Sequence, residues 1–483
     1  MSSDQRRSVE MRAHWKSLLA MTLVSLSKEP TRPDARLTHR ANLKVYGYED
    51  PTVPLDYNIS SERQQLISSL MVLGSFISSS SAGFSASYIG RKPSLWLACV
   101  LVFVSTAVMQ TTTSIGALYA GRTILGLGNG LLMTHGQLYI QPVGSLIGTV
   151  VDNFAAKIPH QGAYIIPLGI IHIVPGILAV GLFFIPESPR WLAANGQLQK
   201  AERSLRWLRP QEWSVDEELG EMNAALNAER QLQAKVGYSE LFRNPIDRRR
   251  TTVAVLALTT QAASGAMFVI AFGTYFFEMA NVGNAFENSC ILTGVGVAAL
   301  LANSFIITRY GRRRRLMITG LLLCGLMQLI MAVVYTVEPG TQRSGKILVG
   351  LSVIYIVAYT GLIAPYAWVS GGELPSQRLR SRMLPLNGSS RRLRIWLTTF
   401  TAPYFINPEA LNWGPKYGYI WAPSCIIAAL WIYFFLPEVK GRSLEEIDEM
   451  FEARVPARKF ASYRCTGQHA AVEKVETEHC EKA

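Results

Sequence analysis

Pro186-Glu187-Ser188-Pro189-Arg190-Trp191-Leu192 follows directly on a long apolar run, residues 163–185, and marks the point where the chain turns polar. A carboxylate and a guanidinium without partners are costly in hydrocarbon, so a membrane-spanning segment must end here. Pro437-Glu438-Val439-Lys440-Gly441-Arg442 stands in the same relation to a second apolar run, residues 422–436. This recurrence predicts a chain built from two related halves.

A second signal recurs in the same order. Gly90-Arg91-Lys92 follows the apolar run that begins at Leu66, and Gly311-Arg312-Arg313-Arg314-Arg315 follows the run that begins at Ile291. Basic turns between apolar runs are typical of the cytoplasmic side of a polytopic protein. We therefore predict four parts: a transmembrane half at 1–186, a cytoplasmic linker with short helices at 187–250, a second transmembrane half at 251–437, and a cytoplasmic tail at 438–483.

The composition favours an all-α polytopic membrane protein. The chain is 49% hydrophobic with a mean hydropathy of +0.18, and only 17% of its residues are charged, which is too apolar for an average soluble protein. The net charge of +13 lies in Lys and Arg beside the apolar runs, so it indicates membrane topology rather than nucleic-acid binding. Six cysteines without a C-x-x-C pair indicate neither a metal site nor a disulfide framework, and no cofactor is expected. With no helical His pair and no nucleophile elbow, an enzyme is not expected.

Two apolar stretches of the first half are too short to cross a bilayer. Ser17–Leu26 has ten residues, about 15 Å of helix against a hydrocarbon core of about 30 Å. Residues 138–151 reach about 21 Å and are interrupted by Gln141-Pro142. The distance from the Gly-Arg turn to the Pro-Glu exit is also about 30 residues shorter in the first half than in the second. We therefore predict that spans 1 and 5 are truncated.

A third short stretch lies in the second half. Ile395–Ile406 gives about 18 Å of helix, and Arg391, Arg392 and Arg394 precede it. Each arginine at a helix centre costs about 2.5–3.5 kcal/mol in lipid, so span 11 is also predicted to be truncated. Whether these three truncations are real or arise from a faulty gene translation is left open. If they are real, the chain as written is expected to give no sugar uptake.

Seven motifs together resemble the sugar porter family of the major facilitator superfamily, and fungal sugar permeases most of all. The motifs are Gly90-Arg91-Lys92, Gly121-Arg122, the stretch 186–191, Gln261-x-x-Ser264-Gly265, Gly311-Arg312-Arg313, Pro365-x-x-Trp368 with Glu373, and Pro437-Glu438-x-x-Gly441-Arg442. The resemblance implies a major facilitator fold of two pseudo-symmetric halves with nominally six spans each. It also implies alternating access to a sugar held near the midplane, with both termini in the cytoplasm.

The resemblance also implies roles for individual residues. Gln261 and Trp368 are the expected substrate-binding residues, an amide for hydroxyl groups and an aromatic platform for the sugar ring. The alternatives are a Gln that bonds another helix and a Trp at the membrane interface. Arg122 is the expected proton-coupling residue. Ala262 and Met267 stand where the family has Gln and often Asn, which removes polar contacts from the site.

The remaining charged motif residues resemble the family's cytoplasmic gate network, which would hold the two halves together when the site faces outward. These residues are Arg91, Glu187, Arg190, Arg312, Arg313, Glu373, Arg378, Glu438 and Arg442. Their pairing across the two halves is an expectation from the resemblance alone.

The resemblance implies carbohydrate uptake through the plasma membrane, proton-coupled by descent. The expected partners are a mono- or disaccharide, protons and the lipid bilayer. The alternative is a transport-inactive degenerate member or a sugar sensor on the same scaffold. Sensors of the family tend to carry long tails, and the short tail from Glu452 to Ala483 disfavours that alternative. The identity of the sugar, symport against uniport, and plasma membrane against vacuole are left open.

Overall fold

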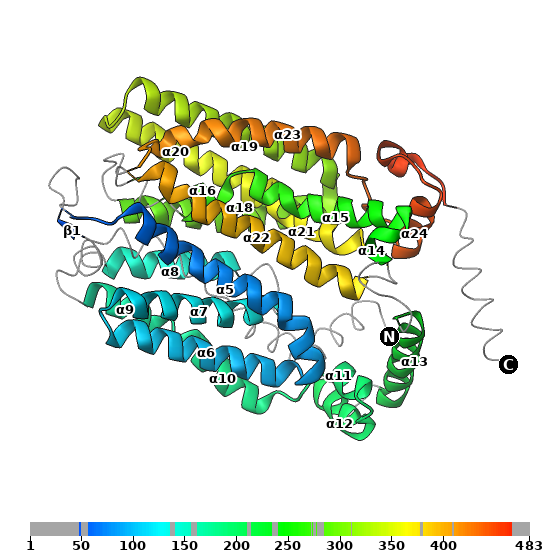
Figure 1. Cartoon of the computed structure of the whole chain (residues 1–483). Coiled ribbons are helices and arrows are strands. Elements are labelled where there is room, and N and C mark those ends of the chain that lie inside the picture. Colours follow the sequence, from blue (N-terminus) through cyan, green and yellow to red (C-terminus); the bar gives the residue numbers. More distant parts are fainter. Residues whose placement is uncertain are drawn as a thin grey trace.

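The computed structural model shows an elongated bundle of helices, described here for residues 48–49, 57–135, 141–155, 162–209, 214–233, 240–271, 273, 277, 285–310, 312–376, 380–407 and 410–465 (Figure 1). Two short antiparallel strands, β1 (Tyr48–Glu49) and β2 (Tyr57–Asn58), pair at one end of the bundle. The predicted first span, Ser17–Leu26, lies outside the described residues.

Six helices of the first half run along the bundle. They are α5 (Ser61–Tyr88), α6 (Arg91–Thr111), α7 (Ile115–His135), α8 (Gln141–Ala155), α9 (Gly162–Ile170) and α10 (Ile173–Phe184). The last two form one apolar segment, interrupted at Ile171 and His172. Buried apolar side chains of α5, α6, α7 and α10, such as Ile67, Val102, Leu132 and Leu178, make one core.

The second half has more described helices. They are α15 (Pro245–Ala263), α16 (Ala266–Ala271), α18 (Ala285–Tyr310), α19 (Arg313–Val337), α20 (Gln342–Ala358), the π-helical turn η1 (Tyr359–Ile363), α21 (Ala364–Glu373), α22 (Arg380–Ile406), the short η3 (Gly414–Tyr417) and α23 (Gly418–Phe435). A separate, larger hydrophobic core joins these helices.

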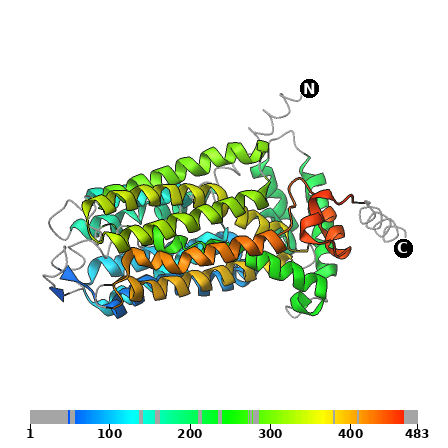
Figure 2. The same cartoon turned by 90° about the horizontal axis from the view of Figure 1, so that it is seen from above.

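The polar parts of the chain gather at the end of the bundle opposite β1 and β2 (Figures 1 and 2). This end, called the linker end below, carries α11 (Pro189–Ala194), α12 (Leu198–Leu208), α13 (Val215–Gln233), α14 (Glu240–Arg243), α24 (Leu444–Glu452) and the short η4 (Ala457–Ser462). Helices α12 and α13 lie within the predicted linker, residues 187–250, and α24 lies within the predicted tail.

Within the described residues, five helical segments are long and apolar enough to cross a membrane by length and composition. They are Arg91–Thr111, Ile165–Phe184, Arg313–Val337, Gln342–Glu373 and Gly414–Phe435. Large apolar side chains on their surfaces are exposed, among them Phe183 at 73% and Ile427 at 68%. An apolar surface of this kind suits hydrocarbon rather than water, so the chain is a multi-pass membrane protein.

Small residues allow α5 and α7 to pack with their backbones in contact. A Cβ on Gly126 would lie 2.1 Å from the carbonyl oxygen of Met71, and a Cβ on Gly74 would lie 2.4 Å from that of Thr123. The Ser75 hydroxyl also donates to the Gly126 carbonyl across 3.0 Å. Close backbone approach at glycine and serine is how helices associate in lipid, where hydrophobic burial gives no advantage.

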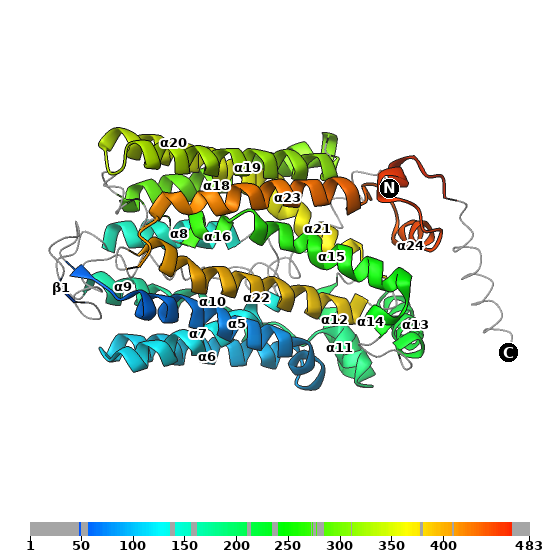
Figure 3. The same ribbon diagram turned by 45° about the horizontal axis from the view of Figure 1, so that its top comes forward.

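The two halves meet along two helix pairs. Helix α22 of the second half packs along α5 of the first, and α18 packs against α8 (Figure 3). Arg392 donates to the Ser75 carbonyl across 2.6 Å near the middle of α5. Toward the end away from the linker, the Asn407 amide donates to the Ile59 carbonyl and to Gln64 Oε1 at 2.9 and 3.0 Å.

The prediction that span 11 is truncated is wrong. Helix α22 is continuous over 27 residues, about 40 Å, and includes Arg391, Arg392 and Arg394. The prediction assumed that these arginines would face lipid, but α22 lies between α5 and α15. Arg392 is only 8% exposed because it reaches the Ser75 carbonyl, and Arg394 donates to the Val255 carbonyl across 3.4 Å. Backbone carbonyls therefore take the place of water.

Other span predictions have mixed outcomes. The described part of helix α8 has 15 residues, about 22 Å, and residues outside the described ones flank it on both sides, so the short fifth span stays a prediction. The apolar pattern of residues 252–278 predicts one span, but the helix breaks between α15 and α16, where Gly265 has a φ of +70°. A positive φ of this size is open to glycine and strained for most other residues.

Candidate functional site

Gln261 lies near the end of α15, two residues before the helix breaks. Its side chain is 3% exposed, and its Nε2 donates to the Ala364 carbonyl across 2.9 Å. Ala364 opens α21 directly after the π-helical turn η1, and Pro365 at the first turn of α21 has no N–H to donate. The amide of Gln261 therefore ties the broken helix to the irregular part of the α20–α21 segment, as the alternative of a Gln that bonds another helix expects, and its role in sugar binding stays a prediction.

Side chains of two other helices stabilise the break. The Ser264 carbonyl accepts from Gln328 Nε2 on α19 at 3.0 Å and from the Tyr355 hydroxyl on α20 at 2.8 Å. All three residues are fully buried. A freed carbonyl at a helix break in lipid needs such donors, because water cannot supply them. Gln328 and Tyr355 thus hold the end of α15, which carries Gln261, in place.

Trp368 lies one turn along α21 from Ala364, the residue that Gln261 contacts. Residues four apart in a helix share a face, so Trp368 follows Ala364 on the side of α21 that meets α15. Its side chain is partly buried. The structure therefore brings the two predicted substrate residues to the same pair of packed helices.

Arg122 occupies α7 and is 2% exposed. A guanidinium so deep in a spanning helix requires acceptors around it, and such residues are functional far more often than not. The resemblance expects an Asp opposite this arginine in a part of the first span that the sequence predicts to be missing, and the predicted first span lies outside the described residues.

Glu187 caps the helix that follows the first Gly-Arg turn. Its carboxylate accepts from the backbone N–H groups of Arg91 and Lys92 at 3.0–3.2 Å and from that of Ser188 at 2.8 Å. Gly90 has a φ of +105°, and a Cβ there would lie 2.7 Å from the same carboxylate. The Pro-Glu exit of the first half thus satisfies the free donors at the start of α6.

The second half repeats this arrangement. Glu438 accepts from the backbone N–H of Arg314 at 2.9 Å, at the start of α19. Arg313 forms an ion pair with Glu373 at the end of α21. The related turns and exits of the two halves therefore make the same contact, an acidic cap on the helix after each Gly-Arg turn.

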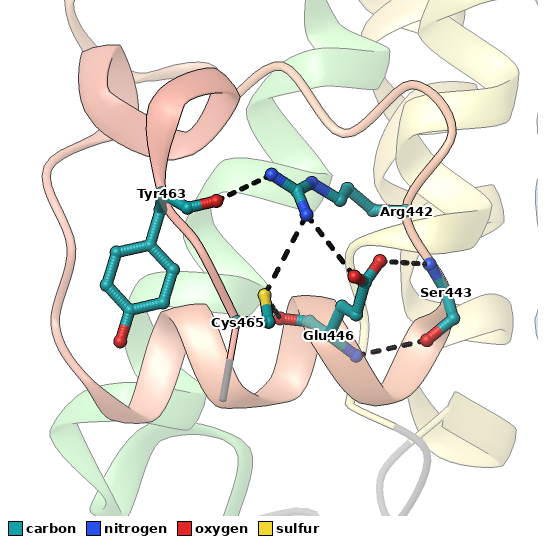
Figure 4. A network of polar contacts seen from close by, with 5 residues as sticks. All are labelled: Arg442, Ser443, Glu446, Tyr463 and Cys465. Carbon is teal, nitrogen blue, oxygen red and sulfur yellow. Dashed lines mark hydrogen bonds and ion pairs between the residues drawn. The ribbon is translucent and has the colours of Figure 1, made fainter. Parts of the chain in front are cut away.

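Arg442 turns toward the tail rather than toward the first half (Figure 4). Its guanidinium donates to the Tyr463 carbonyl at 2.7 Å and to Glu446 at 3.2 Å. Cys465 lies against the same guanidinium, and its Sγ donates to the Glu446 carbonyl at 3.9 Å. Desolvation, then Glu449 and Glu446, raise the pKa of the Cys465 thiol, which keeps it protonated.

The rest of the predicted gate network is scattered. Arg190 and Arg312 are exposed, and Arg378 lies outside the described residues. The contacts described for Glu187, Arg313, Glu438 and Arg442 each stay within one half. The role of these residues in joining the halves stays a prediction.

Sequence reasoning missed the groups that do join the halves. Asn407 is 0% exposed and Arg392 is 8% exposed. Arg392 reaches a carbonyl of α5, and Asn407 reaches the carbonyl of Ile59, two residues before α5 begins. For Arg392, the available signal was an arginine next to an apolar run. It was interpreted as the point where a truncated span begins. For Asn407, a polar residue directly at the end of an apolar run gave no signal that distinguishes it from a loop.

We expect Glu187→Ala to lower the thermal stability of the chain by about 1–2 kcal/mol, because it removes the acidic cap of α6. The midpoint of thermal unfolding of purified protein in detergent measures this. Glu202→Ala is the matched control, since its carboxylate pairs with Arg206 on an exposed helix face. Equal midpoints for the two variants would contradict the capping role.

Comparison with known proteins places this geometry in a family. The sequence profile described as "Sugar (and other) transporter" matches residues 27–142 and 132–451. The two matches meet at residues 132–142, between the end of α7 and the start of the short α8. The junction thus coincides with the place where the sequence predicts an incomplete fifth span.

Curated relatives are similar along most of the chain. The major facilitator-type transporter ecdD of Aspergillus rugulosus is 30% identical over 87% of this chain and 83% of its own length. The maltose permease MAL61 of Saccharomyces cerevisiae is 28% identical over 93% of this chain and 77% of its own. The high glucose sensor RGT2 of the same yeast is 28% identical over 80% of this chain and 54% of its own.

A solved structure shares the fold. The proton:xylose symporter XylE, from E. coli, superposes with a TM-score of 0.70 at 19% identity, covering 91% of this chain and 99% of that one. The likeness confirms the major facilitator fold predicted from the paired motifs. With a family profile matched over most of its length and the paired halves seen in the fold, the chain belongs to the sugar porter family of the major facilitator superfamily and is a transporter by family, not an enzyme.

Proposed function

We propose that the chain takes up a mono- or disaccharide by alternating access and couples the uptake to protons. The observation that carries the proposal is the buried amide of Gln261, held between a broken helix and the helix of Trp368. An amide donates and accepts at once, which suits neighbouring sugar hydroxyls, and an aromatic ring covers the apolar face of a sugar. Substrate sites of such transporters lie at interrupted helices.

Arg122 supports the proton-coupled form of this proposal. Burying a charged group to 2% exposure among packed helices is costly, and such groups mark proton or ion pathways in membrane proteins. The relative XylE is a proton:xylose symporter, which makes the same coupling a reasonable expectation for this chain.

The contacts between the halves support a state closed at the end away from the linker. Asn407 joins Ile59 and Gln64 at that end, whereas Glu187, Glu438 and Arg442 make contacts within their own halves at the linker end. In the opposite state we expect the amide contact of Asn407 to open and the charged groups to pair across the halves.

We place the linker end in the cytoplasm, together with both termini, and the protein in the plasma membrane. The basic turns at Arg91 and at Arg312–Arg315 lie at this end, and positive charge is retained on the cytoplasmic side.

Uptake of labelled sugars by a transport-null yeast that expresses the chain tests the proposal. We expect saturable uptake of at least one hexose or disaccharide, and a fall in accumulation when a protonophore is added. The test is stringent because the described part of α8 is short, and a first half with an incomplete fifth span would leave the carrier inactive. Uptake at the level of the empty vector for every sugar would contradict the proposal.

A sugar sensor is the second candidate, because the chain is similar to the high glucose sensor RGT2. A sensor binds sugar and changes conformation without a complete transport cycle. Sugar binding to the purified chain without uptake would favour the sensor, whereas binding together with uptake favours the carrier.

A further inference from the structure

Helix α23 ends at the linker end in three exposed aromatic side chains. Tyr433, Phe434 and Phe435 are 46%, 52% and 57% exposed. They precede Pro437, where the chain leaves the helix. Aromatic side chains at the end of a spanning helix lie at the level of lipid headgroups, since their rings tolerate both acyl chains and water.

Two arginines from distant parts of the chain flank these rings. The guanidinium carbon of Arg458 lies 4.4 Å from the centroid of the Tyr433 ring and 4.6 Å from that of Phe434. The guanidinium carbon of Arg314, at the start of α19, lies 5.4 Å from the Tyr433 centroid. Because both are close to the same ring, the two guanidinium groups are within about 10 Å of each other.

The position of Arg458 is fixed by the packing of its neighbours. It belongs to η4, whose Ala457 and Phe460 are 6% and 0% exposed. The Phe460 ring packs edge-on against Phe451 of α24 at 5.1 Å. Arg458 itself is exposed, so the tail presents a guanidinium to the membrane surface from an anchored backbone.

The local charge around Tyr433 is positive. Glu438 is the acidic group at this place, and its carboxylate accepts the backbone N–H of Arg314. Arg315 and Lys459 are exposed nearby in sequence, whereas the neighbouring Arg313 already has Glu373 as its partner. Two guanidinium groups thus lie near one ring, while the Glu438 carboxylate accepts a backbone N–H, and this arrangement favours an additional anion between lipid and protein.

We propose that Arg314 and Arg458 bind the phosphate of an anionic phospholipid, with its acyl chains lying along the exposed aromatic side chains of α23. Guanidinium groups suit phosphate oxygens, and basic pockets between spanning helices on the cytoplasmic side bind anionic headgroups. The site lies apart from Gln261 and Trp368, and it does not depend on which sugar is carried. The proposed orientation decides only which leaflet supplies the lipid.

Native mass spectrometry of the full chain, released from detergent with equimolar phosphatidylglycerol and phosphatidylcholine, tests the site. We expect one phosphatidylglycerol to be retained in preference to phosphatidylcholine. R314Q combined with R458Q should lower that retention at least tenfold, and R314K with R458K should retain more lipid than the Gln pair. Arg464→Gln is the control, because this arginine is exposed on the same tail, six residues beyond Arg458, and it should retain as much lipid as the unchanged chain.

Retention equal to that of the unchanged chain in the double Gln variant, or equal retention of the two lipids, would overturn the proposal. A second measurement avoids variants that fail to fold. Short-chain phosphatidylglycerol should raise the thermal unfolding midpoint of the unchanged protein, and short-chain phosphatidylcholine and inorganic phosphate should not. A shift of equal size with inorganic phosphate would overturn the assignment to a lipid and indicate a free-phosphate site.

Discussion

Gln261→Ala is expected to lower kcat/KM for sugar uptake by about 10- to 100-fold, mainly through a higher KM. In the proposed site the amide of Gln261 bonds to sugar hydroxyls, and alanine leaves those hydroxyls without partners in a dry part of the membrane. The variant also loses the bond to the Ala364 carbonyl, so the positions of α15 and α21 become less well fixed. Initial rates of labelled-sugar uptake over a range of concentrations measure both constants.

Gln110→Ala is the matched control for this experiment. Its amide donates to the Ile165 carbonyl across 3.4 Å at an exposed position between α6 and α9, far in sequence from the proposed site. We expect KM to stay within about twofold of that of the unchanged chain, which corresponds to less than about 0.5 kcal/mol. A KM that is unchanged in Gln261→Ala, with normal amounts of protein in the membrane, would show that Gln261 only joins helices.

Arg122→Gln is expected to abolish accumulation of sugar against a gradient while exchange of internal for external sugar continues. The substitution keeps a hydrogen-bonding group but removes the buried charge that a coupled proton site requires. The ratio of internal to external sugar at steady state should fall to unity, and counterflow from preloaded vesicles should remain.

Arg343→Gln, an exposed arginine at the start of α20, is the control and should accumulate sugar as the unchanged chain does. Arg122→Lys keeps the charge and separates a coupling role from a packing role, because it should restore part of the accumulation. Accumulation above unity in Arg122→Gln would contradict the coupling role of this arginine.

The two-half architecture could be predicted from the sequence because it rests on local signals with a strong physical cause. A charged motif after an apolar run must mark the end of a span, and the two Pro-Glu exits mark equivalent places. The structure gives both the same task, since Glu187 and Glu438 each cap the helix after a Gly-Arg turn. The short fifth span stays a prediction from a signal of the same local kind, the interruption of residues 138–151 at Gln141-Pro142.

The eleventh span was mispredicted because hydropathy treats each helix as if lipid surrounded it. Arg392 lies against α5, more than 300 residues earlier in the chain, where the Ser75 carbonyl accepts a hydrogen bond from its guanidinium. The sequence around Arg392 therefore gives no indication of a partner so distant in the chain. The same reason hides Asn407, whose partners Ile59 and Gln64 belong to the other half.

The helix break at Gly265 shows the same contrast at the candidate site, between what the local sequence indicates and what residues distant in sequence determine. The resemblance marked Gln261 and Ser264-Gly265 as a motif, but a continuous span was predicted there because the apolar pattern runs through it. The break persists because Gln328 and Tyr355, on two other helices, supply donors to the Ser264 carbonyl. Motif residues could be located in the sequence, whereas the groups that position them could not.

A pH electrode in a weakly buffered suspension of de-energised cells that express the chain gives the most direct test of proton-coupled sugar uptake. Adding the transported sugar should make the medium transiently alkaline, because each sugar enters with a proton, and a protonophore should abolish the signal. Sugar entry without alkalinisation would contradict the coupling, and no sugar entry at all would contradict the carrier itself.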